Sequence, residues 1–240
     1  MATKPGFPEI LAFGDTGYGD ELAWAALTTL EIAILAYALG LAIGIVGALA
    51  KLNGSGLTKI ILGGYTTLVR AVPELVLILL LYYAGTTALN GLLESVGIGS
   101  VAINGFVVAV GVLGFVQGAY STEVLRAAIQ AIPLGQIEAA RAYGMSPWLE
   151  FRRITLPSML PFALPGLGNL WLIVTKDTAL IAVVGYTELA LATRQAAGNT
   201  KMYFTFFMVA GAVYLAITLV SQQGFGWLER RVRRGQRLHA

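Results

Sequence analysis

Long apolar runs that contain no Asp, Glu, Lys or Arg recur along this chain, with short polar segments between them. A membrane-spanning helix needs about 20 mostly apolar residues, because each residue adds about 1.5 Å along the helix axis. Five runs reach that scale, and each predicts a transmembrane helix. They are Ile32–Ala50, Leu75–Leu93, Ser95–Thr122, Ile154–Thr175 and Met202–Leu228.

Turn-forming residues set the ends of the predicted helices. The five predicted spans cover residues 24–50, 60–85, 104–125, 160–184 and 203–227. The stretch 85–104 is rich in Gly, Ser and Asn and is predicted to be a loop. The region 178–202, with its polar segment Thr193–Lys201, is predicted to be a helix end followed by a loop. The pattern therefore predicts an all-α membrane protein with a single transmembrane domain over residues 1–240.

Composition supports lipid as the solvent for most of the protein surface. Hydrophobic residues make up 57% of the 240 residues and charged residues only 12%. A soluble domain carries about 25% charged residues, because even a large globular protein needs a polar coat. An ordinary cytosolic enzyme and a disordered chain are therefore excluded. A disulfide scaffold is excluded as well, because the chain has no cysteine.

Lys and Arg residues in short loops predict the orientation, because cytoplasmic loops carry the excess of positive charge. Five spans place the two chain ends on opposite sides. One side carries Lys4, Arg194 and Lys201. The other carries Lys51, Lys59, Arg126, Arg141, Arg152, Arg153, Arg230, Arg231, Arg233, Arg234 and Arg237. The N-terminus is thus predicted outside and the C-terminus in the cytoplasm, and the basic tail Glu229–Arg237 predicts a membrane-surface anchor rather than a nucleic-acid site.

The predicted cytoplasmic loop between the third and fourth spans, residues 126–158, has signals for two short helices. Pro133 interrupts the helix that leaves the third span, and helix-forming residues follow over Gln136–Tyr143. Gly144 stands where a helix C-terminal cap is expected. Ser146 and Pro147 then favour a new helix as its N-cap and first residue, and Leu156-Pro157 is predicted to end it.

The first loop helix is predicted to present a face of small residues made by Ala139, Ala140 and, just beyond it, Gly144. Such a face lets the surface of another protein approach closely. The alternative is an amphipathic helix that covers the inner mouth of the bundle.

Seven positions of this loop match the pattern EAA-x3-G-x9-I-x-LP without a gap: Glu138, Ala139, Ala140, Gly144, Ile154, Leu156 and Pro157. The loop resembles that of the permease subunits of bacterial ABC importers. Residues 64–73, 118–126 and 176–180 resemble the polar amino-acid subfamily, above all its histidine/arginine/octopine-type permeases. The resemblance extends over about residues 20–232. Two positions depart from the subfamily pattern: Ala71, where Gly is usual, and Asp177, where many relatives have Asn or Ser.

This resemblance implies a permease of the type I importer fold in the bacterial inner membrane. The implied partners are a second permease subunit, identical or a sister chain, two ATP-binding ABC subunits on the cytoplasmic face, and a solute-binding protein that delivers an amino-acid substrate outside. The loop helix is implied to be the coupling helix, which docks on the ATPase. The residues implied at that contact are Gln136, Glu138, Ala139, Ala140, Arg141 and Gly144.

The chain lacks the sequence motifs of ATP-hydrolysing and metal-dependent enzymes, as expected of a transport subunit that makes and breaks no covalent bonds. The chain has no GxxxxGK[ST] loop, so ATP and Mg²⁺ are expected on the partner ATPase and no cofactor on this chain. With no cysteine and one histidine, His239, a metal site is not expected. The segment Gly17–Asp20 resembles the GxGD motif of intramembrane aspartyl proteases, but it lies outside every predicted span and is predicted to be a turn. The alternative function is a secondary transporter or channel subunit without an ATPase partner.

Ionisable groups inside a membrane span are costly unless they are paired or hydrated, so each is a candidate for function. Arg70 and Glu74 are four residues apart and are predicted to share one helical face, with Pro73 kinking the helix between them. Two interpretations remain open. The two charges close an ion pair, or Glu74 faces the central path and meets the cationic side chain of a basic amino acid. The resemblance favours the second, because histidine- and octopine-type relatives carry an acidic residue here.

A second polar group lies near the outer half of the fourth span, where Asn169 precedes Lys176, Asp177 and Thr178. A zwitterionic ligand needs a donor for its carboxylate and an acceptor for its ammonium group. Lys176 or Thr178, together with Asp177, would supply both, and the alternative is an ion pair within or between subunits. Glu123 is predicted to form a structural pair with the residue three positions on, Arg126.

Overall fold

The computed structural model describes residues 10–14, 17–97 and 104–233, and within those ranges it contains helices and connecting segments but no strand. Along these ranges the chain forms α2 (Gly19–Asn53), α3 (Gly56–Ala71), α4 (Glu74–Ser95) and α5 (Gly105–Gln130). Then come α6 (Leu134–Ala142), α7 (Pro147–Glu150), a π-helical turn (Phe151–Thr155) and α8 (Leu156–Asp177). A 3₁₀ helix (Thr178–Val184), α9 (Leu189–Thr200) and α10 (Tyr203–Arg233) complete the described chain.

Five helical segments in the described ranges are long and apolar enough to cross a membrane, which confirms the predicted number of spans. They are Gly19–Asn53, Glu74–Ser95, Gly105–Gln130, Pro147–Val184 and Tyr203–Arg233. Lys4 and the end of the basic tail from Arg234 onward, which includes His239, lie outside the described residues.

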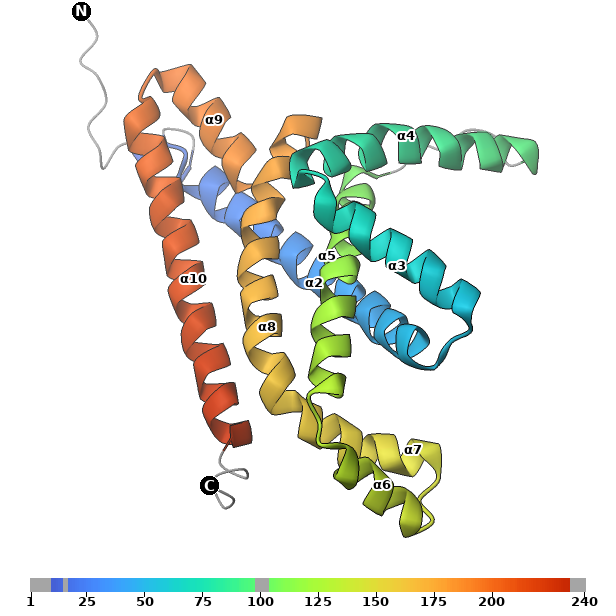
Figure 1. The fold of residues 1–240 in the computed structure, drawn as a ribbon. Helices are drawn as coiled ribbons and strands as arrows, with labels where there is room; N and C mark the ends of the chain where they lie inside the picture. The colour runs from blue at the N-terminus through green and yellow to red at the C-terminus, as the bar shows by residue number, and fades with distance from the viewer. Residues whose placement is uncertain (1–9, 15–16, 98–103, 234–240) are drawn as a thin grey trace, which may run out of the picture.

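The helices form an open bundle in which α5, α8 and α10 run alongside one another and α2 crosses behind them at an angle (Figure 1). The helices α6 and α7 and the last turn of α10 lie at one end of this bundle, and α9 lies at the other (Figure 1). The helix α4 points away from the bundle, and Ile78 is the buried residue along its described length. Most of α4 is therefore left for contact with lipid or with another subunit.

The helices α2 and α5 pack closely, and glycines make that closeness possible. A Cβ atom added at Gly40 would lie 2.6 Å from the Cγ atom of Gln117, and one added at Gly44 would collide with Ser121. Side chains larger than hydrogen would therefore push the two helices apart. The Gly40-x-x-x-Gly44 spacing thus serves a contact inside the chain.

Four clusters of buried side chains lie between the described helices, and two of them join the two ends of α2 to the bundle. One cluster joins the end of α2 to α5 and α8 through Ala48, Leu125, Ala128, Ile132, Met159, Ala163, Leu167 and Leu170. The other joins the start of α2 to α9 and α10 through Leu22, Ala25, Leu189, Ala192, Ala196, Ala197, Phe206 and Ala210. Each burial removes apolar surface from contact with the surroundings and fixes where the polar residues of the same helices point.

The predicted second span, 60–85, is interrupted at Pro73, where a kink was predicted, but the interruption is a full break and the bounds 60–85 are wrong. The chain is helical to Ala71, Val72 is extended (φ −94°, ψ 140°), and α4 begins at Glu74. The cause is Pro73, because a proline disfavours helical geometry in the residue before it and has no N–H for the helix. The predicted loop over 85–104 is also wrong at its start, because α4 continues to Ser95; residues 98–103 lie outside the described ranges.

Two further loop predictions are wrong. The helix that starts at Pro147 does not end at Leu156-Pro157 but continues into α8 through the π-helical turn. Pro157 is tolerated because it stands at the start of α8, after a turn whose wider spacing relieves the clash of its ring with the preceding turn. The polar segment Thr193–Lys201 lies largely in α9, whose buried face packs on α2 and α10. In addition, α2 begins at Gly19, so the predicted turn Gly17–Asp20 is helical in its second half.

Candidate functional site

Polar groups from four helices meet around Tyr120, a residue in the middle of α5. The Tyr120 hydroxyl donates a hydrogen bond to Oε1 of Glu74 at 3.3 Å. The charges of Arg70 and Asp177 also lie within interaction range of this hydroxyl. The end of α3, the start of α4 and the end of α8 therefore place charges within electrostatic range of the middle of α5. We call this group the Tyr120 cluster: Arg70, Glu74, Tyr120 and Asp177.

The break at Pro73 explains how Arg70 and Glu74 are placed. Arg70 lies in the last turn of α3 and Glu74 in the first turn of α4. A cation at a helix C-terminus and a carboxylate at a helix N-terminus each interact favourably with the backbone dipoles of their own helix. The prediction of a shared helical face is therefore wrong, and the ion pairs found in the described ranges do not include Arg70 with Glu74.

The other predicted path residues differ in how they are exposed. Asp177 is half-buried, and its charge interacts with that of Glu74, whereas Lys176 is exposed. Thr178 is fully buried and its hydroxyl donates to the Thr175 carbonyl oxygen at 2.8 Å. Asn169 lies exposed on α8, about two turns before Asp177. The structure thus brings Asp177 to the Tyr120 cluster and places Thr178 inside the bundle.

The chemistry of the Tyr120 cluster suits a charged organic ligand. Two carboxylates whose charges repel each other accept hydrogen bonds from an ammonium or guanidinium group, and binding such a cation relieves the repulsion. The exposed guanidinium of Arg70 is a donor for a carboxylate. No bond-making chemistry is required of these groups.

The loop after α5 folds into the helix, turn and helix that its sequence predicts. Gly144 ends α6 with φ +72°, a left-handed conformation that glycine adopts without a steric penalty. The Ser146 side chain accepts a hydrogen bond from the Leu149 N–H, and Pro147 begins α7. Arg141 of α6 donates to Glu150 of α7 at 3.0 Å, and this bond raises the pKa of the Arg141 guanidinium.

The exposed surface of α6 differs from the predicted face of small residues. Ala140 is 3% exposed and points into the protein, whereas Ala139, Glu138 and Gly144 are exposed. The prediction that Ala140 belongs to the outward face is wrong, because the 3.6-residue helical repeat turns it toward the bundle. The Gln136 side chain accepts a hydrogen bond from the Ser158 hydroxyl at 3.1 Å, which ties α6 to α8.

Large apolar side chains stand out from the same loop. Leu134 is 74% exposed, Tyr143 84% and Trp148 69%. Beside them, a cavity of about 840 Å³ opens between α6, α7 and the end of α2, and its walls include Leu52, Ile137 and Trp148. Exposed aromatic residues next to a hollow are typical of surfaces that bind another protein.

The predicted pair of Glu123 with Arg126 is present, with 2.8 Å between the carboxylate and the guanidinium. Sequence analysis missed its second partner, Lys51, whose Nζ atom lies 2.5 Å from Oε1 of Glu123. Thr66 of α3 also donates to this oxygen, at 3.0 Å. The pattern of apolar runs places Lys51 in a loop, whereas the structure places it in the last turn of α2.

Sequence analysis also missed Glu188, a fully buried carboxyl just before α9. Its side chain accepts a hydrogen bond from the Leu191 N–H at 2.9 Å and another from the Tyr214 hydroxyl at 3.1 Å. Burial raises the pKa of the Glu188 carboxyl, although these hydrogen bonds act in the opposite direction. An acidic residue directly before the apolar run Leu189–Leu191 is a helix-start signal, and it was available in the sequence.

Comparison with known proteins finds a protein family that matches most of this chain. Residues 23–234 match the family described as "Binding-protein-dependent transport system inner membrane component". The chain is 44% identical over 232 residues to the nopaline transport system permease protein NocQ of Agrobacterium fabrum (strain C58 / ATCC 33970), covering 95% of this chain and 98% of that protein. It is also 44% identical over 215 residues to the histidine/lysine/arginine/ornithine transport system permease protein HisQ of Escherichia coli (strain K12), covering 90% of this chain and 94% of that protein.

A solved structure resembles the fold as well. It is described as a crystal structure of an amino acid ABC transporter with histidines, and it superimposes with a TM-score of 0.74 at 30% sequence identity. The match covers 89% of this chain and 95% of that one.

Proposed function

This chain belongs to the family of binding-protein-dependent transport system inner membrane components, and from that premise we propose that it forms the membrane path for basic amino acids or related opines. Membership makes it a permease subunit of an ABC importer and a multi-pass protein of the inner membrane, with five apolar helices long enough to cross it. Two relatives at 44% identity carry nopaline in one case and histidine, lysine, arginine and ornithine in the other, according to their names.

The Tyr120 cluster is the observation that carries the substrate class. Glu74 and Asp177 bring two negative charges together beside the Tyr120 hydroxyl, and the ion pairs of the described residues leave both of them out. A cationic side chain of the substrate would bind between these carboxylates, and Arg70 would receive its carboxylate group. Lys176 and Asn169 would line the neighbouring stretch of the path on α8. Nothing in this arrangement favours a neutral apolar substrate.

We further propose that α6 is the coupling helix on the cytoplasmic side. The positive charges of the sequence support this orientation, because the end that holds α6 and α7 also holds the arginine-rich end of α10 (Figure 1). There, Arg231 lies 5.3 Å from the centre of the Trp227 ring, a pairing suited to a membrane surface. The exposed residues Glu138, Ala139 and Arg141, with Tyr143 beside them, would contact the ATPase.

The partners follow from this role. Two ATP-binding subunits would hydrolyse ATP with Mg²⁺, so this chain itself would bind neither. A solute-binding protein would deliver the substrate to the outer face. A second permease, identical or a sister chain, would cover the apolar surface that α4 leaves exposed.

Transport measurements on the Glu74→Gln variant test the substrate class. A hydrogen bond to a charged group contributes about 1.5–3 kcal/mol, so uptake affinity for lysine and arginine should fall about 10- to 100-fold. Uptake of a neutral relative such as glutamine should change little. The matched control is Glu94→Gln, an exposed position on the same helix α4. Equal losses for charged and neutral substrates would remove Glu74 from cation recognition.

Co-purification tests the coupling role of α6. The Glu138→Lys variant reverses an exposed charge on α6, so the amount of ATPase that purifies with the permease should fall, whereas Glu94→Lys should leave it unchanged. An ATPase that stays attached and active in Glu138→Lys would contradict the assignment. A wild-type protein that transports without any ATPase would support the alternative of a secondary transporter.

A further inference from the structure

The contacts of Glu123 connect three helices through one carboxylate. Oε1 lies 2.5 Å from Nζ of Lys51 in the last turn of α2 and 3.0 Å from the hydroxyl of Thr66 in α3. Oε2 accepts two hydrogen bonds from Arg126, at 2.8 and 3.1 Å. Lys51 also donates to Thr66 at 2.9 Å. We call these four residues the Glu123 junction.

The Glu123 junction is largely shielded from its surroundings. The side chain of Lys51 is 14% exposed and that of Glu123 is 16% exposed. Two ions at such a position lose much of their hydration, and an apolar pair of similar size would often stabilise a protein as well or better. Charge-assisted hydrogen bonds differ from apolar contacts because they fix distance and direction. The junction is therefore better suited to holding helices in one relative position than to adding stability.

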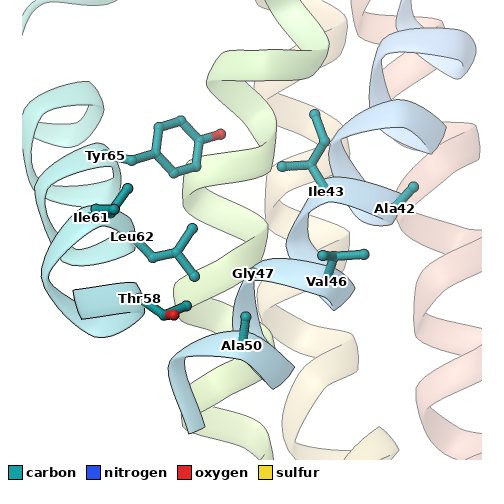
Figure 2. Close-up of a pocket in the computed structure, with 9 residues that line it drawn as sticks. All are labelled: Ala42, Ile43, Val46, Gly47, Ala50, Thr58, Ile61, Leu62 and Tyr65. Atoms are coloured by element: carbon teal, nitrogen blue, oxygen red, sulfur yellow. The ribbon is translucent and has the colours of Figure 1, made fainter. Parts of the chain in front are cut away.

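Packing between α2 and α3 is otherwise loose. An apolar hollow of about 600 Å³ separates the two helices, with Ile43, Val46 and Ala50 on one side and Ile61, Leu62 and Tyr65 on the other (Figure 2). By contrast, α2 meets α5 closely along its glycines, and α3 is fastened to α5 by the hydrogen bond from Tyr65 to the Phe115 carbonyl oxygen at 2.6 Å. Between α2 and α3, the direct polar contact in the described residues is thus the hydrogen bond from Lys51 to Thr66.

The Glu123 junction is also connected to the helix proposed to meet the ATPase. Arg126 donates to Gln130, the last residue of α5, at 2.7 Å, and α6 begins four residues later at Leu134. On its other side, α6 is tied to α7 by Arg141 and Glu150 and to α8 by Gln136 and Ser158. A displacement of α6 would therefore reach the end of α5, at the turn that carries Arg126, as well as α7 and α8.

We infer that Glu123 is a positioning residue for coupling: it makes the inner ends of α2, α3 and α5 move as one body when α6 is displaced. This inference rests on the proposed function of α6. With the carboxylate in place, motion at α6 is passed from α5 to Lys51 and Thr66 and so to α3, whose last turn carries Arg70 of the Tyr120 cluster. Without it, α5 and the closely packed α2 move while the inner end of α3 lags, and ATP is hydrolysed without a matching movement of substrate.

The test is the number of substrate molecules imported per ATP hydrolysed, measured on the complete transporter in proteoliposomes with its ATPase and solute-binding protein. We expect Glu123→Gln and Lys51→Met to keep ATP hydrolysis that responds to the binding protein, while import per ATP falls about tenfold. The double variant should be no worse than Glu123→Gln alone, because both changes remove the same contact. Lys59→Met, an exposed lysine at the start of α3, is the matched control and should retain the wild-type ratio.

If Glu123 had only a structural role, its variants would yield less assembled transporter. The transporter that does assemble would still import the wild-type number of substrate molecules per ATP. That result would overturn the inference. An inactive wild-type transporter would contradict the proposed function, and this inference with it, whereas a coupled wild type with equally coupled variants contradicts the inference alone.

A second experiment covers the case in which the charge variants fail to fold. The chain has no cysteine, so Lys51→Cys with Thr66→Cys introduces a single pair for a short chemical cross-linker between α2 and α3. Import per ATP should be low before cross-linking and should recover after it. A ratio that is already normal before cross-linking, or that does not recover afterwards, would overturn the inference.

Discussion

The carboxylate of Glu188 accepts a hydrogen bond from the hydroxyl of Tyr214 at 3.1 Å, which joins the start of α9 to the middle of α10. The hydroxyl of Thr29 reaches the same carboxylate oxygen at 3.4 Å and also accepts the Leu189 N–H. Glu188 is fully buried, and the ion pairs of the described residues give it no cation. The N-terminus of α9 and two hydroxyl groups therefore stabilise this carboxyl in place of a counter-ion.

Stability should depend on pH through Glu188. Burial raises the pKa of its carboxyl above the ordinary value of 4.5, so the folded protein binds this proton more tightly than the unfolded chain does. The resulting stabilisation is complete below the unfolded pKa and is lost as the pH rises through the folded pKa. The Tm advantage of the wild type over Glu188→Gln, measured in detergent, should therefore shrink as the pH rises above 4.5. A Tm difference that stays constant as the pH rises would contradict the raised pKa of Glu188.

The close packing of α2 on α5 at Gly40, Gly44 and Gly47, which we call the glycine seam, predicts that one added methyl group lowers stability. Gly44→Ala places a Cβ atom against Ser121, and overpacking of this kind costs about 1–3 kcal/mol. Its Tm should fall. Gly211→Ala on α10 is the control, because a Cβ atom there has no neighbour within 4 Å. Replacing a helical glycine with alanine at an open site should raise stability by about 0.5–1 kcal/mol, so a similar response at both positions would refute the close seam.

The left-handed conformation of Gly144 predicts that replacing this residue weakens binding of the ATPase at the turn after α6. Gly144→Ala leaves the space around the residue open but forces φ +72° on a residue with a Cβ atom, at a cost of about 1–2 kcal/mol. The turn should then deform and retain less ATPase during purification. Gly144→Asn should retain more ATPase than Gly144→Ala, because asparagine tolerates this conformation better.

Gly135→Ala is the control for that measurement, because Gly135 lies in α6 with an ordinary φ and open space around it. Its retention of the ATPase should match the wild type. If Gly144→Ala retained as much ATPase as Gly135→Ala, the geometry of the turn would have no part in docking.

Much of the fold was predictable because it depends on local chemistry. Five spans follow from the length and composition of the apolar runs, since any helix that crosses lipid must be apolar over about 20 residues. The turn at Gly144 and the helix start at Ser146 and Pro147 follow from neighbouring residues alone. The pairing of Glu123 with Arg126 was predictable for the same reason, because three residues separate them on one helix.

Local patterns failed where a residue's partner lies far along the chain. Lys51 reaches Glu123 across 72 residues, and Glu188 reaches Thr29 across 159. The polar segment after Thr193 is helical because its small residues pack against α2 and α10, and polarity along the chain does not report that burial.

The sequence by itself determined that this chain is a bundle of membrane helices with two short helices between the third and fourth spans, because lipid contact and helix capping are properties of neighbouring residues. The likeness of that loop to ABC permeases depended on its motif. Tertiary structure decided in which direction α4 runs after the break at Pro73, and that the charges of Arg70, Glu74 and Asp177 lie near Tyr120. A charge inside a membrane protein is stabilised by whichever groups surround it, and those groups are brought together only when the helices pack.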